Sequence, residues 1–138
     1  MADFLYSSQG ESPWWCANRQ NEIQTVVISN TVTNIGDRAF KDCQNLHTIE
    51  IPNSVIIIGI QAFNNCINLQ TLVIPNSVNY IEGEAFRSSG LKNLTIANGS
   101  DALTLGSHDN YYSRYEDWFT DCPLQTLHLG RTISIYYG

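Results

Sequence analysis

Hydrophobic residues recur through the middle of the chain at an interval of 22 or 23 residues. Three consecutive segments align along most of their length: 28–50, 51–73 and 74–95. Seven columns stay apolar in all three segments, and they are Ile28/Ile51/Ile74, Val32/Val55/Val78, Ile35/Ile58/Ile81, Ala39/Ala62/Ala85, Phe40/Phe63/Phe86, Leu46/Leu69/Leu91 and Ile49/Leu72/Leu94. Self-similarity at one period indicates a solenoid, because a single unit cannot bury its apolar face without neighbours stacked on it.

The repeat continues in both directions. Upstream, the spacing of Ile23, Val26 and Ile28 matches that of the later segments. Downstream, treating 106–116 as an inserted loop restores the period. The alignment then assigns three further residues: Leu103 to the isoleucine column of Ile81, Trp118 to the alanine column and Phe119 to the phenylalanine column. We therefore predict one domain, with an N-terminal cap over 1–22 and a solenoid of about five coils over 23–138.

Each coil combines two periodicities. In the pattern LxxIxI the last two apolar residues alternate, as they do in a half-buried strand. In the pattern IGxxAFxxC the apolar spacing is closer to three or four, which predicts a short helical or 3₁₀ turn. Stacking then brings the strands together in parallel at roughly 4.8 Å. The predicted fold is α/β to mainly β, with a parallel sheet and a stack of phenylalanines inside the coils.

The repeated unit IPNSVxxIGxxAFxxCxxLxxI resembles the BspA-type (Treponema-like) leucine-rich repeat family. Segment 12–28 resembles that family's N-terminal cap, and segment 119–134 resembles its variant coil FxxCPLxxLxLGRxIS. Ser89 and Glu82 depart from the motif, which has Cys and Gly there. The resemblance implies a leucine-rich-repeat solenoid that is secreted or displayed on a cell surface. It also implies adhesion to, or interaction with, a host or neighbouring-cell surface protein or glycan.

Composition limits the partners. Charged residues are 14 % of the 138, and the formal net charge is −6, which disfavours nucleic acid. No apolar run reaches the roughly 18 residues of a transmembrane helix. The first residues lack the basic and apolar regions of a signal peptide. The extracellular or cell-surface localisation therefore follows from the resemblance alone.

No motif indicates an enzyme, a metal site or a cofactor. GxSxG, HExxH and P-loop sequences are absent from the chain. His47 and His128 fall on coils with two others between them, too far apart to share a metal. Glu82 and Glu84 are expected on an exposed turn, where solvation explains them better than acid–base catalysis. We expect a protein that is not an enzyme and needs no cofactor.

Cysteines occupy one column of adjacent coils. Cys43 and Cys66 are expected at roughly 5 Å between Cα atoms, within the range of a disulfide. Ser89 takes the same position in the next coil, which favours small buried side chains over a bridge. Cys16 and Cys122 have no evident partner.

The outward positions of the predicted strands form two rows. They are Thr25, Thr48, Thr71, Asn93 and Thr126 in one row, and Val27, Glu50, Val73, Thr95 and His128 in the other. A threonine ladder stabilises a sheet by itself, and solenoids also bind partners through such flat faces. The candidate binding residues on this face are Thr48, Glu50, Thr71 and His128, with the purely structural explanation left open.

The inserted loop is the part of the sequence that the repeat pattern does not account for. The stretch 106–118 carries four candidate contact residues, Tyr111, Tyr112, Arg114 and Tyr115. Tyr and Arg are frequent anchors of interfaces, and aromatic rings also suit a glycan. The alternative is that aromatic side chains of the loop fold back over the next coil, which we expect of Trp118 because of its core column.

Two further surfaces could support self-association. Ile56, Ile57 and Ile60 stand where neighbouring segments are mostly polar, so with Tyr80 they are expected to form an exposed apolar patch. The C-terminal stretch 130–138 begins another coil and leaves a strand edge that another chain could cover. A spacer in a larger surface protein is the alternative to a binding or adhesion module.

Overall fold

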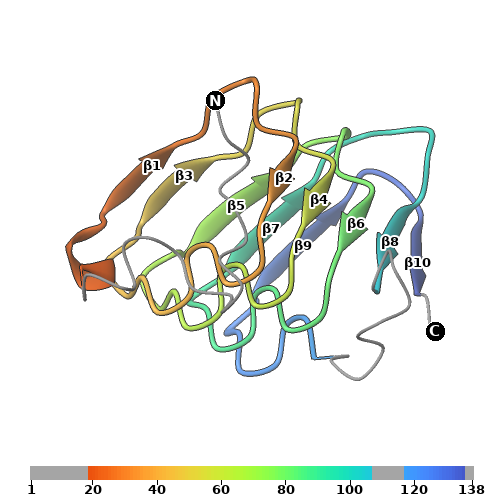
Figure 1. The fold of residues 1–138 in the computed structure, drawn as a ribbon. Helices are drawn as coiled ribbons and strands as arrows, with labels where there is room; N and C mark the ends of the chain where they lie inside the picture. Colours follow the sequence, from red (N-terminus) through yellow and green to blue (C-terminus); the bar gives the residue numbers. More distant parts are fainter. Residues whose placement is uncertain (1–18, 107–116, 136–138) are drawn as a thin grey trace.

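The computed structural model describes residues 19–106 and 117–135, which form a solenoid with two layers of strands (Figure 1). A 3₁₀ helix, η1 (Gln20–Glu22), precedes the strands. The first layer consists of the odd-numbered strands β1 (Thr25–Val27), β3 (Thr48–Glu50), β5 (Thr71–Ile74), β7 (Asn93–Ile96) and β9 (Thr126–Leu129). The second layer consists of β2 (Asn34–Ile35), β4 (Ile57–Ile58), β6 (Tyr80–Ile81), β8 (Leu103–Leu105) and β10 (Ile133–Ile135). No helix of these residues is long and apolar enough to span a bilayer.

All strand pairs are parallel, as predicted. In the first layer β1 pairs with β3, and β7 lies between β5 and β9. Leu94 of β7 is opposite Leu72 on one side and Leu127 on the other, so the leucine column holds across coils of different length. The second layer is one five-stranded sheet in the order β10-β8-β6-β4-β2. The repeat pattern of the sequence predicted only the first layer.

Apolar columns fill the inside of the coils. Val55, Ile58 and Ala62 are fully buried, as their columns predicted. The phenylalanines stack from coil to coil, with ring centroids 5.3 Å apart for Phe40–Phe63, 5.5 Å for Phe63–Phe86 and 5.6 Å for Phe86–Phe119. These separations are within the range of favourable aromatic contacts, and they confirm the predicted phenylalanine stack.

The segments predicted as short helical turns are instead chains of turns. Some of their backbone groups bond within the coil, such as Cys43 N–H to Phe40 O at 3.2 Å, and others bond to the next coil, such as Phe40 N–H to Ala62 O at 2.8 Å. Positive φ angles at Arg38 (55°) and Asp42 (61°) interrupt any helical path. The turns therefore join neighbouring coils as the strands do.

The insertion begins earlier than predicted. Ile81 pairs with Leu105 rather than with Leu103, so the predicted column of Leu103 is wrong by two residues. Leu105 follows Ile81 by 24 residues, whereas the paired residues Ile74 and Ile96 are 22 apart. Two extra residues therefore precede β8, and the rest follow it.

After the insertion, Trp118 occupies the alanine column, as predicted. Phe86 N–H donates to Trp118 O at 3.1 Å, just as Phe63 N–H donates to Ala85 O at 2.7 Å. The indole Nε1 of Trp118 donates to Ile81 O at 3.1 Å, and the ring packs against the core. The expected core position of Trp118 is confirmed.

Candidate functional site

The outer face of the first layer is exposed over all five coils. Every member of the predicted row that runs from Thr25 to Thr126 is exposed. In the second row, Val27 is 90 % exposed and Val73 is 53 % exposed, while Thr95 is half-buried. The candidates Thr48, Glu50, Thr71 and His128 all lie on this face and are exposed. Their predicted exposure is confirmed, and a role in binding stays a prediction.

A groove of about 610 Å³ borders this face where the strands begin, and its lining includes the amides of Asn45 and Asn68. Each of these two amides is tied to the preceding coil. Asn45 Nδ2 donates to Asn21 O at 2.6 Å, and Asn68 Nδ2 donates to Gln44 O at 2.8 Å. These side chains hold the coils together at this edge.

A larger groove, of about 1080 Å³, borders the face where the strands end. Its lining includes a column of four exposed asparagines, one from each of four successive coils: Asn30, Asn53, Asn76 and Asn98. None of these amides makes a side-chain hydrogen bond to any residue that the structure describes. Sequence reasoning missed this column. Its signal was an asparagine two positions after the repeated isoleucine in four coils.

Arg131 supports this groove from beneath. It occupies the place after Asn98 in the same column, but its side chain turns inward and is only 8 % exposed. Its Nη1 donates to Asn76 O at 2.9 Å, and its Nη2 donates to Pro75 O at 3.2 Å and to Val78 O. A buried guanidinium therefore fixes the turn that carries Asn76. Arg131 was not among the site residues predicted from the sequence.

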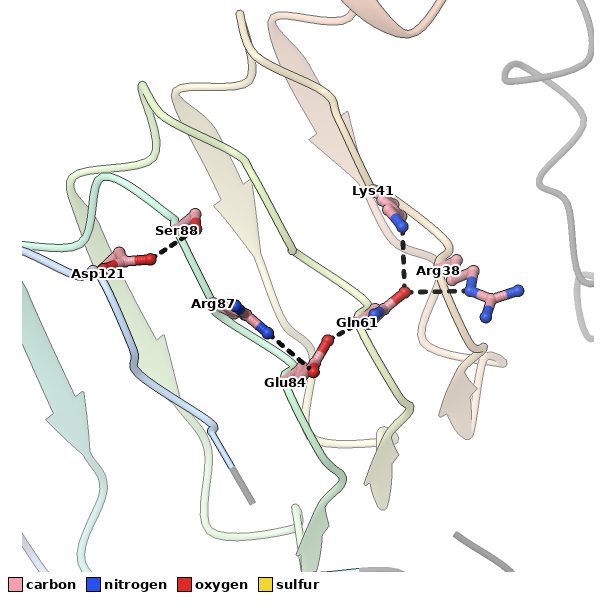
Figure 2. A network of polar contacts seen from close by, with 7 residues as sticks. All are labelled: Arg38, Lys41, Gln61, Glu84, Arg87, Ser88 and Asp121. Carbon is pink, nitrogen blue, oxygen red and sulfur yellow. Dashed lines mark hydrogen bonds and ion pairs between the residues drawn. The ribbon is translucent and has the colours of Figure 1, made fainter. Parts of the chain in front are cut away.

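The turn side of the coils carries a different arrangement of polar groups (Figure 2). Gln61 Oε1 accepts hydrogen bonds from Arg38 Nε at 3.1 Å and from Lys41 Nζ at 3.2 Å. Gln61 Nε2 donates to Glu84 Oε2 at 2.5 Å, and Arg87 forms an ion pair with Glu84 at 3.1 Å. Two further pairs link coils on this side, Asn65 to Asp42 and Ser88 to Asp121. These polar side chains bond to one another across coils.

The expectation that Glu82 and Glu84 lie on an exposed turn is wrong. Glu82 is 4 % exposed and Glu84 is 8 % exposed, because the stacked turns of neighbouring coils cover them. Glu84 is held by Gln61 and Arg87. Its carboxylate therefore serves to join coils.

The predicted isoleucine patch is only partly exposed. Ile56 is 41 % exposed, but Ile57 and Tyr80 are half-buried partners in β4 and β6. Ile60 is 7 % exposed, so its predicted exposure is wrong. Its backbone bonds to the preceding coil through Arg38 N–H at 2.8 Å, which places the side chain among stacked turns. A broad apolar patch is therefore absent from this position of the described chain.

The C-terminal coil exposes apolar residues that earlier coils bury. Leu127, Leu129 and Ile135 are 51 %, 54 % and 47 % exposed, whereas Leu94 of the same column as Leu127 is 1 % exposed. Strands β9 and β10 are the outermost strands of their sheets within the described residues. Self-association through this end stays a prediction.

The three cysteines in the described segments, Cys43, Cys66 and Cys122, are free thiols, as the sequence analysis favoured. Burial raises the pKa of Cys43 to about 12, and burial also raises the pKa of Cys66. Cys66 Sγ donates to Phe40 O at 3.1 Å. Protonated thiols therefore act here as small packing groups. Among the same residues, no cluster of three or more His, Cys, Asp or Glu side chains could hold a metal.

The four loop candidates Tyr111, Tyr112, Arg114 and Tyr115 lie outside the described residues, as does Cys16. The contact role of the loop stays a prediction. The division into a cap over 1–22 and a solenoid over 23–138 also stays a prediction.

Comparisons with known proteins agree with this architecture. A family model, the BspA type leucine-rich repeat region with six copies, matches residues 16–137. The crystal structure of a leucine-rich repeat protein from Bacteroides ovatus is similar in fold, with a TM-score of 0.54 and 20 % sequence identity. The similarity covers 79 % of this chain and 31 % of that protein, so the chain spans about a third of its length. A search of curated proteins finds no match.

Proposed function

Because this chain belongs to the BspA-type leucine-rich repeat family, we propose that it is a non-catalytic adhesion module on a cell surface. It binds a protein of a host or neighbouring cell through the outer face of the first layer. The observation that supports this proposal is the exposure of nine of the ten positions of the two outward rows over five coils, with Thr95 half-buried. Most side chains of these rows are Thr or Val, which are stiff because they are β-branched, and a rigid surface loses little entropy when a partner binds.

The chemistry of the face suits a protein partner. Val27 and Val73 offer exposed apolar contacts, while Glu50, which is opposite Val27, and His128 add polar groups to the same face. Interfaces combine such apolar centres with a polar surround. Thr48 Oγ1 is 2.9 Å from Nδ1 of His47, which orders one hydroxyl of the row.

A charge placed on the central strand tests this proposal. Val73→Arg is expected to abolish binding in a screen of host-surface and matrix proteins, because the arginine would stand in the middle of the contact. Ile67→Arg is the matched control, since Ile67 is 49 % exposed but lies outside the strands. Equal binding by the two variants contradicts the proposed face. If the unmodified protein binds none of the proteins in the screen, the spacer alternative is supported.

Self-association is a second candidate function, and the exposed Leu127 and Leu129 favour it. Another copy stacked on this coil would continue both sheets in parallel and bury the leucines. Analytical ultracentrifugation is expected to show concentration-dependent assembly that Leu127→Lys/Leu129→Lys removes. A monomer at all concentrations contradicts it.

A further inference from the structure

We infer that the groove at the strand ends binds a neutral, linear polysaccharide that runs along the solenoid axis. The groove holds about 1080 Å³ and crosses four coils, at Asn30, Asn53, Asn76 and Asn98. Each exposed amide has two N–H donors and one carbonyl acceptor, and none of these groups is bonded to a described side chain or backbone group. The site thus repeats one recognition unit four times.

The spacing of the column selects the kind of ligand. Paired parallel strands lie about 4.8 Å apart, so successive asparagines repeat at nearly that interval along the solenoid. The monosaccharide units of a linear β-1,4-linked polysaccharide repeat at a length close to this strand spacing. An extended peptide advances roughly 3.3 Å per residue, so its groups fall out of step with the amides. One sugar can therefore face each asparagine.

The other lining residues favour a sugar without charge. Ser54 and Thr71 add hydroxyls, and Val73 and Pro52 offer apolar surface for the C–H groups of a pyranose ring. Glu50 is the charged residue in the lining, and the whole chain carries −6. Both repel uronic acids and sulfated sugars. A neutral glycan meets no such repulsion.

The groove is organised before a ligand arrives. Arg131 bonds to the carbonyl groups of Pro75, Asn76 and Val78, which fixes the backbone beneath the third asparagine. Asn53 stands on a turn that Ser54 ties to the preceding coil, through Oγ to Val32 O at 2.7 Å. Fixed turns reduce the entropy lost when the glycan binds.

This inference does not depend on the proposed protein partner. Replacing an asparagine side chain changes no residue of β1, β3 or β5. Conversely, the variant Val73→Arg affects the outer face and the groove together, so only the asparagine variants separate the two proposals.

Calorimetric titration with neutral β-1,4-linked oligosaccharides of glucose, mannose and N-acetylglucosamine, from two to six units long, tests the inference. For at least one sugar, affinity is expected to rise with length up to about four units and then level off, as expected for four stacked coils. Asn53→Ala/Asn76→Ala is expected to weaken binding about tenfold, the effect of losing two ligand hydrogen bonds. Gln24→Ala/Gln70→Ala, which removes two exposed amides from the opposite groove, is expected to leave affinity unchanged.

Three results would overturn the inference. One is the absence of binding by every neutral oligosaccharide. Another is equal affinity of the two double variants for the sugar. The third is tighter, asparagine-dependent binding of oligogalacturonate or of a proline-rich peptide, which would assign the groove to an acidic glycan or to an extended chain.

Discussion

The turn side and the strand-end side of the coils are both polar, yet their side chains behave differently. On the turn side, Gln61 lies between Arg38 and Glu84 and bonds to both (Figure 2). On the strand-end side, Asn53 and Asn76 are exposed and bond to no described residue. A repeated polar column can therefore either join coils or remain available to a ligand. Hydrogen bonding distinguishes the two cases, whereas residue type does not.

The largest expected effect comes from the apolar stack beneath the turn side. Phe63→Ala is expected to lower the free energy of unfolding by about 3–5 kcal/mol, because Phe63 is fully buried between two other rings. Urea denaturation followed by circular dichroism measures this change. The control Ile67→Ala removes an exposed side chain and should change stability by less than about 0.5 kcal/mol. A similar loss in both variants would show that the turns are not held by the stack.

The next largest effect concerns Arg131, the residue that ties the strand-end side to the core. Arg131→Ala is expected to cost roughly 2–4 kcal/mol, since it leaves three backbone carbonyl groups without their charged donor. Arg131→Lys should recover only part of the loss, because an ammonium group cannot reproduce the guanidinium fork. Thermal and urea unfolding of the unmodified protein and of the two variants measure the order of their stabilities. Full recovery by lysine would contradict the geometric role.

On the turn side itself, Gln61→Ala is expected to cost about 1 kcal/mol, because it breaks several partly solvated hydrogen bonds at once. The matched control is Gln70→Ala, an exposed glutamine without a side-chain hydrogen bond in the described chain. Urea midpoints of the two variants give the comparison. Equal midpoints would mean that the network in Figure 2 contributes little to stability.

The smallest expected effect is on the strand-end side. Asn53→Ala/Asn76→Ala should change the free energy of unfolding by no more than about 0.5 kcal/mol, because these amides are exposed and make no bond to the fold. Differential scanning calorimetry measures it. A loss comparable to that of Gln61→Ala would show that the column is structural, and the contrast between the two sides would disappear.

Sequence reasoning succeeded where one residue type recurs in a packed column. The positions of Val55, Ile58 and Phe63 follow directly from the period, because a buried column tolerates only apolar side chains. It failed for the second sheet, since strands as short as Ile57–Ile58 show no alternation to detect. It also failed for Ile60, whose burial depends on how turns of neighbouring coils stack.

The candidate site was predictable only in part. The outward rows follow from strand alternation, so the exposure of Thr48, Glu50, Thr71 and His128 could be predicted. The asparagine column could not be recognised as a groove, because asparagine is common in turns for conformational reasons alone. Only the absence of hydrogen-bond partners distinguishes Asn53 and Asn76 from ordinary turn residues.

The extra residues of the inserted coil lie on both sides of β8, and this has a practical consequence for protein engineering. Leu105 and Trp118 both keep the column positions of a shorter coil, although Trp118 follows Leu105 by 13 positions whereas Ala85 follows Ile81 by four. The coils on either side therefore stay in register although the segment between these two residues is longer than in the other coils. A foreign epitope or a second recognition peptide could be exchanged into this position while the stacked coils continue past it in register.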